Sequence, residues 1–168
     1  MNEVVLVDRQ DRPTGTREKM EAHRKGELHR AISVFVFNSS GELMLQRRAL
    51  GKYHSEGLWT NTCCSHPYPG ESAADAARRR VKEEMGLEIE PVFSHAFVYK
   101  GQLDNGLTEF EFDHVFTAVT DAIPDPDPTE VADWKFMTMN DLRTDARTNP
   151  GDYTLWFRII LEDPLFRF

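Results

Sequence analysis

Apolar and β-branched residues recur in short runs along the first part of the chain. The runs Val4–Asp8, Ala31–Phe37 and Leu43–Arg47 predict strands, because each is bounded by turn-forming or polar residues. The segment NSSGE separates the last two runs, so we expect them to form a β-hairpin. The stretch DRPTG predicts a turn, and Arg17–Arg24 predicts a short helix.

A longer helix is predicted over Ser72–Met85. Ser72 can cap its first turn, with Asp75 three residues later, and Gly86 can end it. Four apolar residues recur at the spacing of one helix face, which we expect to be buried: Ala74, Ala77, Val81 and Met85.

The second half of the chain again alternates strand-like runs with turns. Val92–Tyr99 and Thr108–Val119 predict strands joined by a turn that contains DNG, and Trp134–Met137 predicts another strand. The stretch DAIPDPDPTEV predicts an irregular connector, a polar segment follows Met137, and Tyr153–Leu161 predicts a buried helix. Many strands mixed with few helices favour an α+β or mixed α/β sandwich, and the length favours one domain over residues 1–168.

Composition and charge narrow the function classes. The 168-residue chain holds 20 Lys and Arg against 28 Asp and Glu, which gives a formal net charge of −8. This balance argues against a nucleic-acid or anionic-membrane surface, which needs a basic stripe. The sequence shows no signal-peptide pattern, and its longest apolar run is too short to cross a bilayer. We therefore expect a cytoplasmic protein.

The stretch WTNTCCSHP, residues 59–67, contains both cysteines of the chain. Neighbouring Cα atoms lie about 3.8 Å apart, below the roughly 4.4–6.8 Å that disulfides require. A cytoplasmic location also keeps thiols reduced, so a disulfide is not expected. In an extended segment Cys64 and His66 share one face, and Cys63 points to the other.

A second candidate cluster combines carboxylates with imidazoles. In TEFEF, Glu109 and Glu111 alternate with phenylalanines, so both carboxylates point to one face of a strand. That face could also be solvent-exposed, but His23, His29 and His66 supply the nitrogen ligands that divalent metals use together with carboxylates.

Basic residues form a third group on this acidic chain: Lys19, Arg47, Arg48 and Lys52. They indicate either a phosphate-binding cluster or a solvated turn.

The segment that ends at Leu87 resembles the Nudix box. The box reads Gly, five residues, Glu, seven residues, Arg-Glu, apolar, any, Glu-Glu, any, Gly, apolar. Two positions depart from it, since Ser65 stands for the first Gly and Arg80 for the Glu after Arg. By spacing alone the charged residues could be ion pairs on a solvated helix face. The matching residues are Glu71, Arg79, Val81, Glu83, Glu84, Gly86 and Leu87.

In Nudix hydrolases the box glutamates hold the magnesium that supports attack on a diphosphate. A cation in place of one glutamate should weaken metal binding and diphosphate cleavage, while the resemblance in fold remains. We therefore expect a Nudix-type mixed sheet sandwiched between helices.

Several motifs together resemble type I isopentenyl diphosphate isomerase, a Nudix-fold enzyme of isoprenoid biosynthesis. This resemblance covers nearly the whole chain and implies interconversion of isopentenyl and dimethylallyl diphosphate by protonation of one carbon and deprotonation of another. The motifs are PTGTREKMEAH, LHRA, LMLQRRALGK, GLWTNTCCSHPYPGES, AARRRVKEEMG and EFEFDHVF.

The resemblance implies a role for each candidate residue. Cys64 matches the catalytic cysteine, and Glu111 with Tyr99 matches the group that exchanges a proton on the opposite substrate face. Glu84 matches the residue that binds a Mg²⁺ ion, and this ion also holds the substrate diphosphate. Trp156 matches the aromatic lid over the hydrocarbon; without the resemblance it would be read as a core residue. The five ligands of a second divalent ion, Mn²⁺, Mg²⁺ or Zn²⁺, are matched by His23, His29, His66, Glu109 and Glu111, and the diphosphate-binding cations by Lys19, Arg48, Lys52 and Arg80.

Three histidines match no ligand of the family and are read as structural or exposed: His54, His95 and His114. We expect a monomer that acts on a small-molecule substrate. The alternatives are a Nudix hydrolase of a nucleotide or other diphosphate and a non-catalytic Nudix-fold module with a structural zinc.

Overall fold

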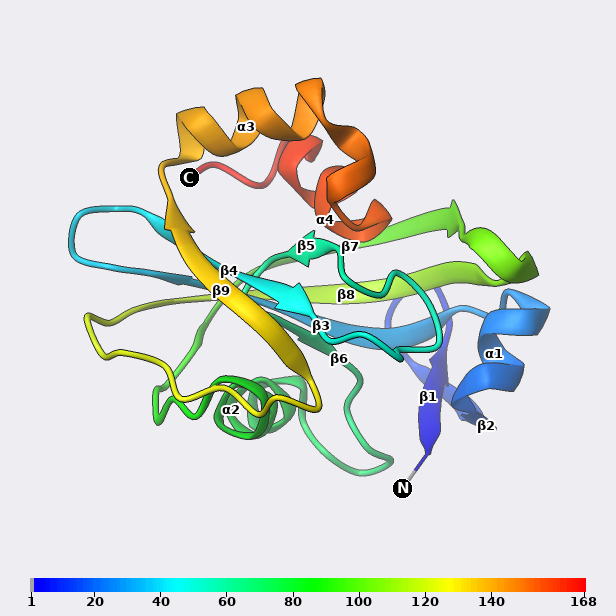
Figure 1. Ribbon diagram of the computed structural model, residues 1–168. Helices are drawn as coiled ribbons and strands as arrows, with labels where there is room; N and C mark the ends of the chain where they lie inside the picture. The colour runs from blue at the N-terminus through cyan, green and yellow to red at the C-terminus, as the bar shows by residue number, and fades with distance from the viewer. Residues whose placement is uncertain (1) are drawn as a thin grey trace.

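The computed structural model describes residues 2–168, and its centre is a mixed sheet of nine strands (Figure 1). Five of the strands follow one another in the order β2-β1-β3-β4-β5, and the others pair with β3, β4 or β8. The strands are β1 (Glu3–Val7), β2 (Pro13–Glu18), β3 (His29–Phe37), β4 (Leu43–Arg48), β5 (Trp59–Thr60), β6 (Cys63–Ser65), β7 (Val92–Gln102), β8 (Thr108–Val119) and β9 (Val131–Met137).

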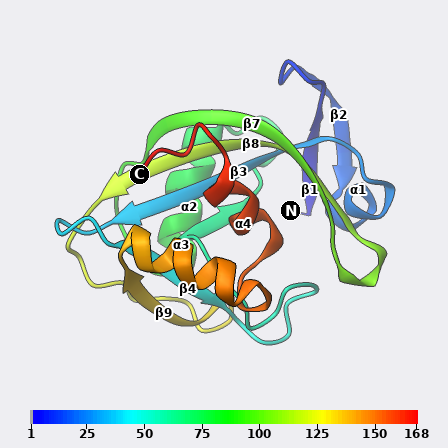
Figure 2. The same cartoon turned by 90° about the horizontal axis from the view of Figure 1, so that it is seen from above.

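Helices cover both faces of this sheet. In Figure 1, α2 (Ala73–Met85) lies below the sheet, and α3 (Met139–Thr148) and α4 (Leu155–Glu162) lie above it. Figure 2 shows α3 and α4 side by side over this upper face, with α1 (Lys19–Lys25) beside β2 at one end. Short 3₁₀ turns lie at Asp104–Gly106 and Pro150–Asp152. The expected mixed sheet between helices is thus confirmed.

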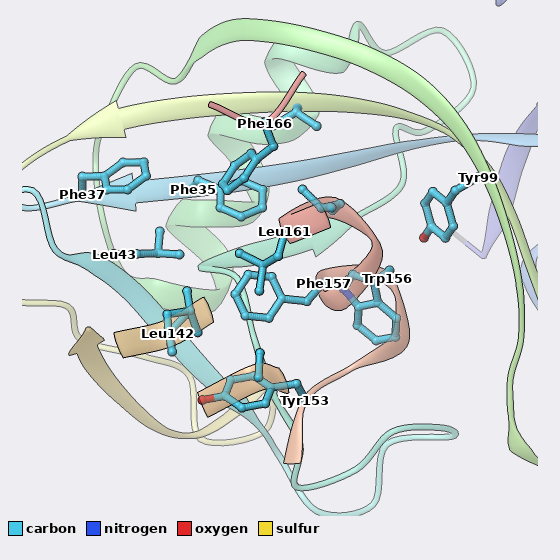
Figure 3. Packing of buried hydrophobic residues seen from close by; sticks show 14 residues of the cluster. Phe35, Phe37, Leu43, Tyr99, Leu142, Tyr153, Trp156, Phe157, Leu161 and Phe166 are labelled. Carbon is cyan, nitrogen blue, oxygen red and sulfur yellow. The ribbon is translucent and has the colours of Figure 1, made fainter. Parts of the chain in front are cut away.

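Side chains of β3 alternate between the two layers, as the period of a strand requires. Phe35 and Phe37 enter the cluster under α3 and α4, which Figure 3 shows with Trp156 at the end nearest Tyr99. Their neighbours Val34 and Val36 enter the cluster between the sheet and α2. Residues of β3 and of its partner strands can therefore be assigned to one face or the other.

The strands β3 and β4 pair only at Phe37 and Leu43, beside the turn that joins them. Beyond this point β6 pairs with β3, and β5 pairs with β4. The sheet therefore divides, and the space between the two halves is where polar side chains gather.

The predicted caps of α2 are confirmed. The Ser72 side chain accepts a hydrogen bond from the Asp75 amide, and Gly86 takes the left-handed conformation that ends the helix. The buried face differs from the predicted one, since Ala74 is exposed, whereas Ala76 and Glu84 are buried. Which residues of α2 are buried depends on how the helix packs against the sheet, and the helix spacing alone does not determine this.

Two segments differ from their predicted structure. Residues 13–18 form strand β2, because each pairs with or lies beside a residue of β1, so the helix begins only at Lys19. The polar segment after Met137 contains helix α3, which Thr138 caps by accepting from the Asp141 amide. Only Leu142 and Ala146 of this helix are buried, so its apolar pattern is short.

The end of α2 generates a stability prediction. Gly86 has φ +67°, and a Cβ at this position would lie 2.4 Å from the backbone oxygen of Asp125. Gly41, the matched control, has φ +78° and no atom within 4 Å of such a Cβ. We expect Gly86→Ala to lower the free energy of unfolding by about 3 kcal/mol and Gly41→Ala by about 1 kcal/mol. Urea titration measures both, and equal losses would contradict the steric account.

Candidate active site

A pocket lies beside β3, where β3 and β4 have separated. Its walls come from both faces of the sheet, because the gap between the strands lets side chains of α2 meet side chains from the α4 side. The lining includes eleven residues of the sequence-derived site: Lys19, Arg48, Lys52, Cys64, His66, Arg80, Glu84, Tyr99, Glu109, Glu111 and Trp156.

Imidazoles and carboxylates meet at one end of this pocket. His29 on β3 lies directly opposite Glu111 on the parallel strand β8, and its Nε2 is 3.5 Å from Glu111 Oε1. His66 Nε2 lies 3.0 Å from the same oxygen. With His23 from α1, ligand atoms of these four residues lie within 4.8 Å of one another. Glu109 Oε1 is 3.8 Å from His23 Nε2.

Backbone carbonyls fix how two of the imidazoles are protonated. His23 Nδ1 lies 2.7 Å from the Lys19 carbonyl oxygen, and His29 Nδ1 lies 2.8 Å from the Glu27 carbonyl oxygen. Since a carbonyl only accepts, each Nδ1 carries the proton and each Nε2 offers a lone pair. Both Nε2 atoms are buried without a hydrogen-bond partner among residues 2–168. This donor set fits a divalent metal ion.

Burial controls the charges of the cluster. It lowers the pKa of His66 to about 3 and also lowers the pKa of His23, so both imidazoles are neutral, as metal ligands must be. Burial and the neighbouring Glu111 raise the pKa of Glu109. Burial opposes ionisation of Glu111 as well, but hydrogen bonding, with His66 Nε2 as a donor 3.0 Å away, holds its pKa well below the usual range.

Tyr99 lies opposite Glu111 in the register of β7 and β8. Its hydroxyl donates to Glu111 Oε2 over 2.6 Å and lies 3.4 Å from Glu109 Oε2. Burial raises the pKa of Tyr99, so the phenol keeps its proton and remains a donor.

The two cysteines point to opposite faces, as the strand period predicts. Cys63 is buried in the cluster between the sheet and α2, whereas Cys64 faces the pocket. The Cys64 thiol donates to Asn61 Oδ1 over 2.8 Å, and Trp156 Nε1 donates to Cys64 Sγ over 3.0 Å. Burial raises the pKa of Cys64, which keeps this group a thiol. Asn61 was not singled out in the sequence, because nothing in its spacing marks it as a partner of Cys64.

Basic residues line the other end of the pocket. Arg80 Nη2 lies 2.5 Å from Glu84 Oε1 and 3.5 Å from Glu130 Oε2, and Lys52 is paired with Glu130. Glu84 Oε2 accepts a hydrogen bond of 2.8 Å from Gln46 Nε2. Glu130 lies near the end of the irregular connector, and no sequence signal marked it.

The neighbouring residues Arg47 and Arg48 differ in whether they face the pocket. The Arg48 guanidinium lies 5.2 Å from the centre of the Trp156 ring, inside the pocket. Arg47 does not belong to the lining. It is exposed and donates to the Gly57 carbonyl oxygen, because the next residue of a strand points to the opposite face.

His54 was expected to be structural or exposed, and the exposed alternative is wrong. Its side chain is only 4% exposed, lines the pocket and places Nε2 3.4 Å from Glu109 Oε1. His95 and His114 lie outside the lining, and His114 is paired with Asp11. The loop before β5 carries His54 into the site, which spacing along the sequence could not reveal.

Comparisons with known proteins show the fold and the family of the chain. The family model described as the NUDIX domain matches residues 27–157. Solved structures of a protein from Deinococcus radiodurans and a MutT protein from Methanosarcina mazei share the fold. The Deinococcus radiodurans protein has a TM-score of 0.74 and 24% sequence identity, over 90% of this chain and 91% of its own. The Methanosarcina mazei protein has a TM-score of 0.66 and 18% sequence identity, over 80% of this chain and 91% of its own.

Two similar relatives are named isopentenyl-diphosphate Delta-isomerases. The one from Aromatoleum aromaticum, isopentenyl-diphosphate Delta-isomerase 2, is 52% identical, over 96% of this chain and 85% of its own. The one from Pectobacterium atrosepticum is 51% identical, over 95% of this chain and 89% of its own.

The chain belongs to the Nudix family. Within that family it belongs to the isopentenyl-diphosphate Delta-isomerases, since its near-full-length relatives carry that name. Among residues 2–168, no helix is both long and apolar enough to cross a membrane.

The unpartnered imidazole nitrogens generate a prediction about metal binding. We expect Mn²⁺ or Zn²⁺ at a hundredfold excess over its dissociation constant to stabilise the protein by about 2.7 kcal/mol. Thermal unfolding with metal and with chelator measures the difference. His29→Gln should remove most of the shift, whereas His114→Gln, outside the cluster, should keep it. A wild-type protein that unfolds identically with and without metal would contradict the expected site.

Proposed function

We propose that the protein interconverts isopentenyl and dimethylallyl diphosphate by moving the double bond. The observation that carries this proposal is the position of two proton-transfer groups in one pocket. The Cys64 thiol and the Glu111 carboxylate come from different strands and line the same space as the cluster of basic residues.

The reaction needs both groups. An unactivated alkene is a weak base, and its protonation gives a tertiary carbocation or a species close to it. An acid on one side and a base on the other let one carbon gain a proton while another loses one. Bulk water has to be excluded, because it would trap the cation, and the burial of Glu111 and the half-buried position of Cys64 support this requirement.

The surroundings of Cys64 suit a group that changes protonation during turnover. Asn61 Oδ1 accepts a hydrogen bond from the thiol, and Trp156 Nε1 donates one to the sulfur. The protonated thiol therefore has an acceptor in Asn61, and the thiolate has a donor in Trp156. The indole of Trp156 also lines the pocket, where it can stabilise a developing cation by about 0.5–2 kcal/mol.

Glu111 acts on the other substrate face, with Tyr99 donating a hydrogen bond that fixes its carboxylate. When bound by His23, His29, His66, Glu109 and Glu111, a divalent ion (Mn²⁺, Mg²⁺ or Zn²⁺) supplies positive charge that tunes the acidity and orientation of Glu111.

The diphosphate occupies the basic end of the pocket. Lys19, Arg48, Lys52 and Arg80 bind its oxygens there, and Glu84 holds the Mg²⁺ that accompanies it. Arg80 stands where the Nudix box has a glutamate, and a cation at this position favours holding a diphosphate intact over cleaving it. The ion pairs of Arg80 and Lys52 with carboxylates rearrange when the diphosphate binds.

The protein acts on this small molecule as a cytoplasmic monomer, without nucleic acid or membrane. The net charge of −8 supports the last two points, because polyanionic partners require a basic surface.

Product identity tests the proposal against diphosphate hydrolysis. Purified protein is incubated with isopentenyl diphosphate and Mg²⁺, and products are followed by nuclear magnetic resonance and by a phosphate assay. We expect dimethylallyl diphosphate with no released phosphate. Released phosphate would favour the hydrolase, and an unchanged substrate would favour the non-catalytic module.

The paired cysteines provide a matched comparison. Cys64→Ala should lower kcat by at least about 1,000-fold, because it removes a proton-transfer group. Cys63→Ala should leave kcat within about twofold and cost about 1 kcal/mol of stability through a small cavity under α2. Kinetic assays and urea unfolding of both variants measure these effects. Comparable activity losses in the two variants would contradict the assignment of Cys64.

A further inference from the structure

We propose that His54 is an additional ligand of the divalent ion, so that this chain offers four imidazoles to it. The inference rests on the proposed function only in assuming an ion at the His/Glu cluster. His54 comes from the loop between β4 and β5, whereas the other donors come from α1, β3, β8 and the residue after β6.

The donor spacing supports a shared ion. His54 Nε2 lies 3.4 Å and His23 Nε2 lies 3.8 Å from the same oxygen, Glu109 Oε1. Two ligands that each lie about 2.1 Å from an ion are separated by about 3.0 Å at a right angle and about 4.2 Å when opposite. Both measured distances fall between these limits.

His23 connects the two groups of donors. One group contains His23, His29, His66 and Glu111, and the other contains His23, His54 and Glu109. In each group the ligand atoms lie within 4.8 Å of one another. The two groups share only His23, so at least one pair of ligand atoms across them lies more than 4.8 Å apart. His23 Nε2 is buried without a hydrogen-bond partner within the described part of the chain, and an ion bound to this atom would draw the two groups together.

The loop holds the His54 ring toward the cluster. Its Nδ1 lies 3.2 Å from Ser55 Oγ, and Arg48 Nη2 donates to the His54 carbonyl oxygen over 3.2 Å. The ring meets the Trp156 ring edge-on, with centroids 5.6 Å apart. The contacts of Arg48 and Trp156 with this loop connect the ion site to the diphosphate-binding and lid residues.

A fourth imidazole has a chemical consequence. Nitrogen ligands favour the later divalent metals, such as Co²⁺, Ni²⁺ and Zn²⁺, over Mn²⁺ and Mg²⁺. Loss of His54 should therefore weaken Co²⁺ binding more than Mn²⁺ binding. If His54 only hydrogen-bonded to Glu109, its replacement by another donor would affect both metals alike.

Metal titration of the purified full-length protein separates these cases. Dissociation constants for Co²⁺ and Mn²⁺ are measured by chelator competition for wild type, His54→Gln and His54→Ala. The visible absorption of the Co²⁺-loaded proteins reports the ligand set. His95→Gln, on β7 and outside the pocket lining, is the matched control.

We expect His54→Gln and His54→Ala to weaken Co²⁺ binding about 100-fold and Mn²⁺ binding about tenfold or less, with a changed Co²⁺ spectrum. The His95→Gln control should match wild type. Circular dichroism identifies a variant that has lost its fold. If one His54 variant is unfolded, the metal affinities of the other one test the proposal.

An unchanged Co²⁺ spectrum, or equal weakening of both metals, would overturn the ligand assignment. In that case wild type still binds the ion, and the product assay for isomerisation is unaffected. A wild-type protein that binds neither metal would overturn the inference together with the metal part of the proposed function. The product assay on the same preparation would still show separately whether the protein moves the double bond.

Discussion

The pairing of β3 with two different neighbours is the constraint on which the rest of the site depends. Its parallel alignment with β8 places His29 opposite Glu111, and its antiparallel alignment with β6 places Ser33 opposite Cys64. Because His29 and Ser33 lie four residues apart, they point to the same face of the strand. A shift of either partner by one residue would turn Glu111 or Cys64 away from the pocket.

Burial of polar groups is the second feature that unites the site. Glu109, His23 and His29 all lie within the fold, where an uncompensated charge is costly. The structure reduces this cost through neutral imidazoles, carbonyl acceptors and the Tyr99 hydroxyl. The basic end follows the same rule, since Arg80 and Lys52 are paired with carboxylates. We propose that a bound cation neutralises the carboxylates at the imidazole end and that a diphosphate binds the cations at the basic end.

Much of the fold could be predicted from local pattern. The caps at Ser72 and Gly86 and the opposite faces of Cys63 and Cys64 follow from rules that act within a few residues. Eleven of the thirteen sequence-derived site residues line one pocket, because motif matching carries information that spacing lacks.

The features that were missed depend on contacts between distant segments. His54 and Glu130 enter the pocket from loops, whose paths have no periodic signal. Strand β2 forms because β1 lies beside it, and α3 buries only Leu142 and Ala146. In each case tertiary packing decides an outcome that neighbouring residues leave open.

The central claim is that one group of this pocket gives a proton to the substrate and a second group removes a different proton. Incubation of the metal-loaded protein with isopentenyl diphosphate in deuterated water tests it most directly. If one group donates a solvent-exchanged proton while the other removes a substrate proton, dimethylallyl diphosphate should carry deuterium in the methyl group formed from the terminal alkene carbon. Dimethylallyl diphosphate without deuterium would contradict the account, because it would mean that a single group carries the same proton across the substrate.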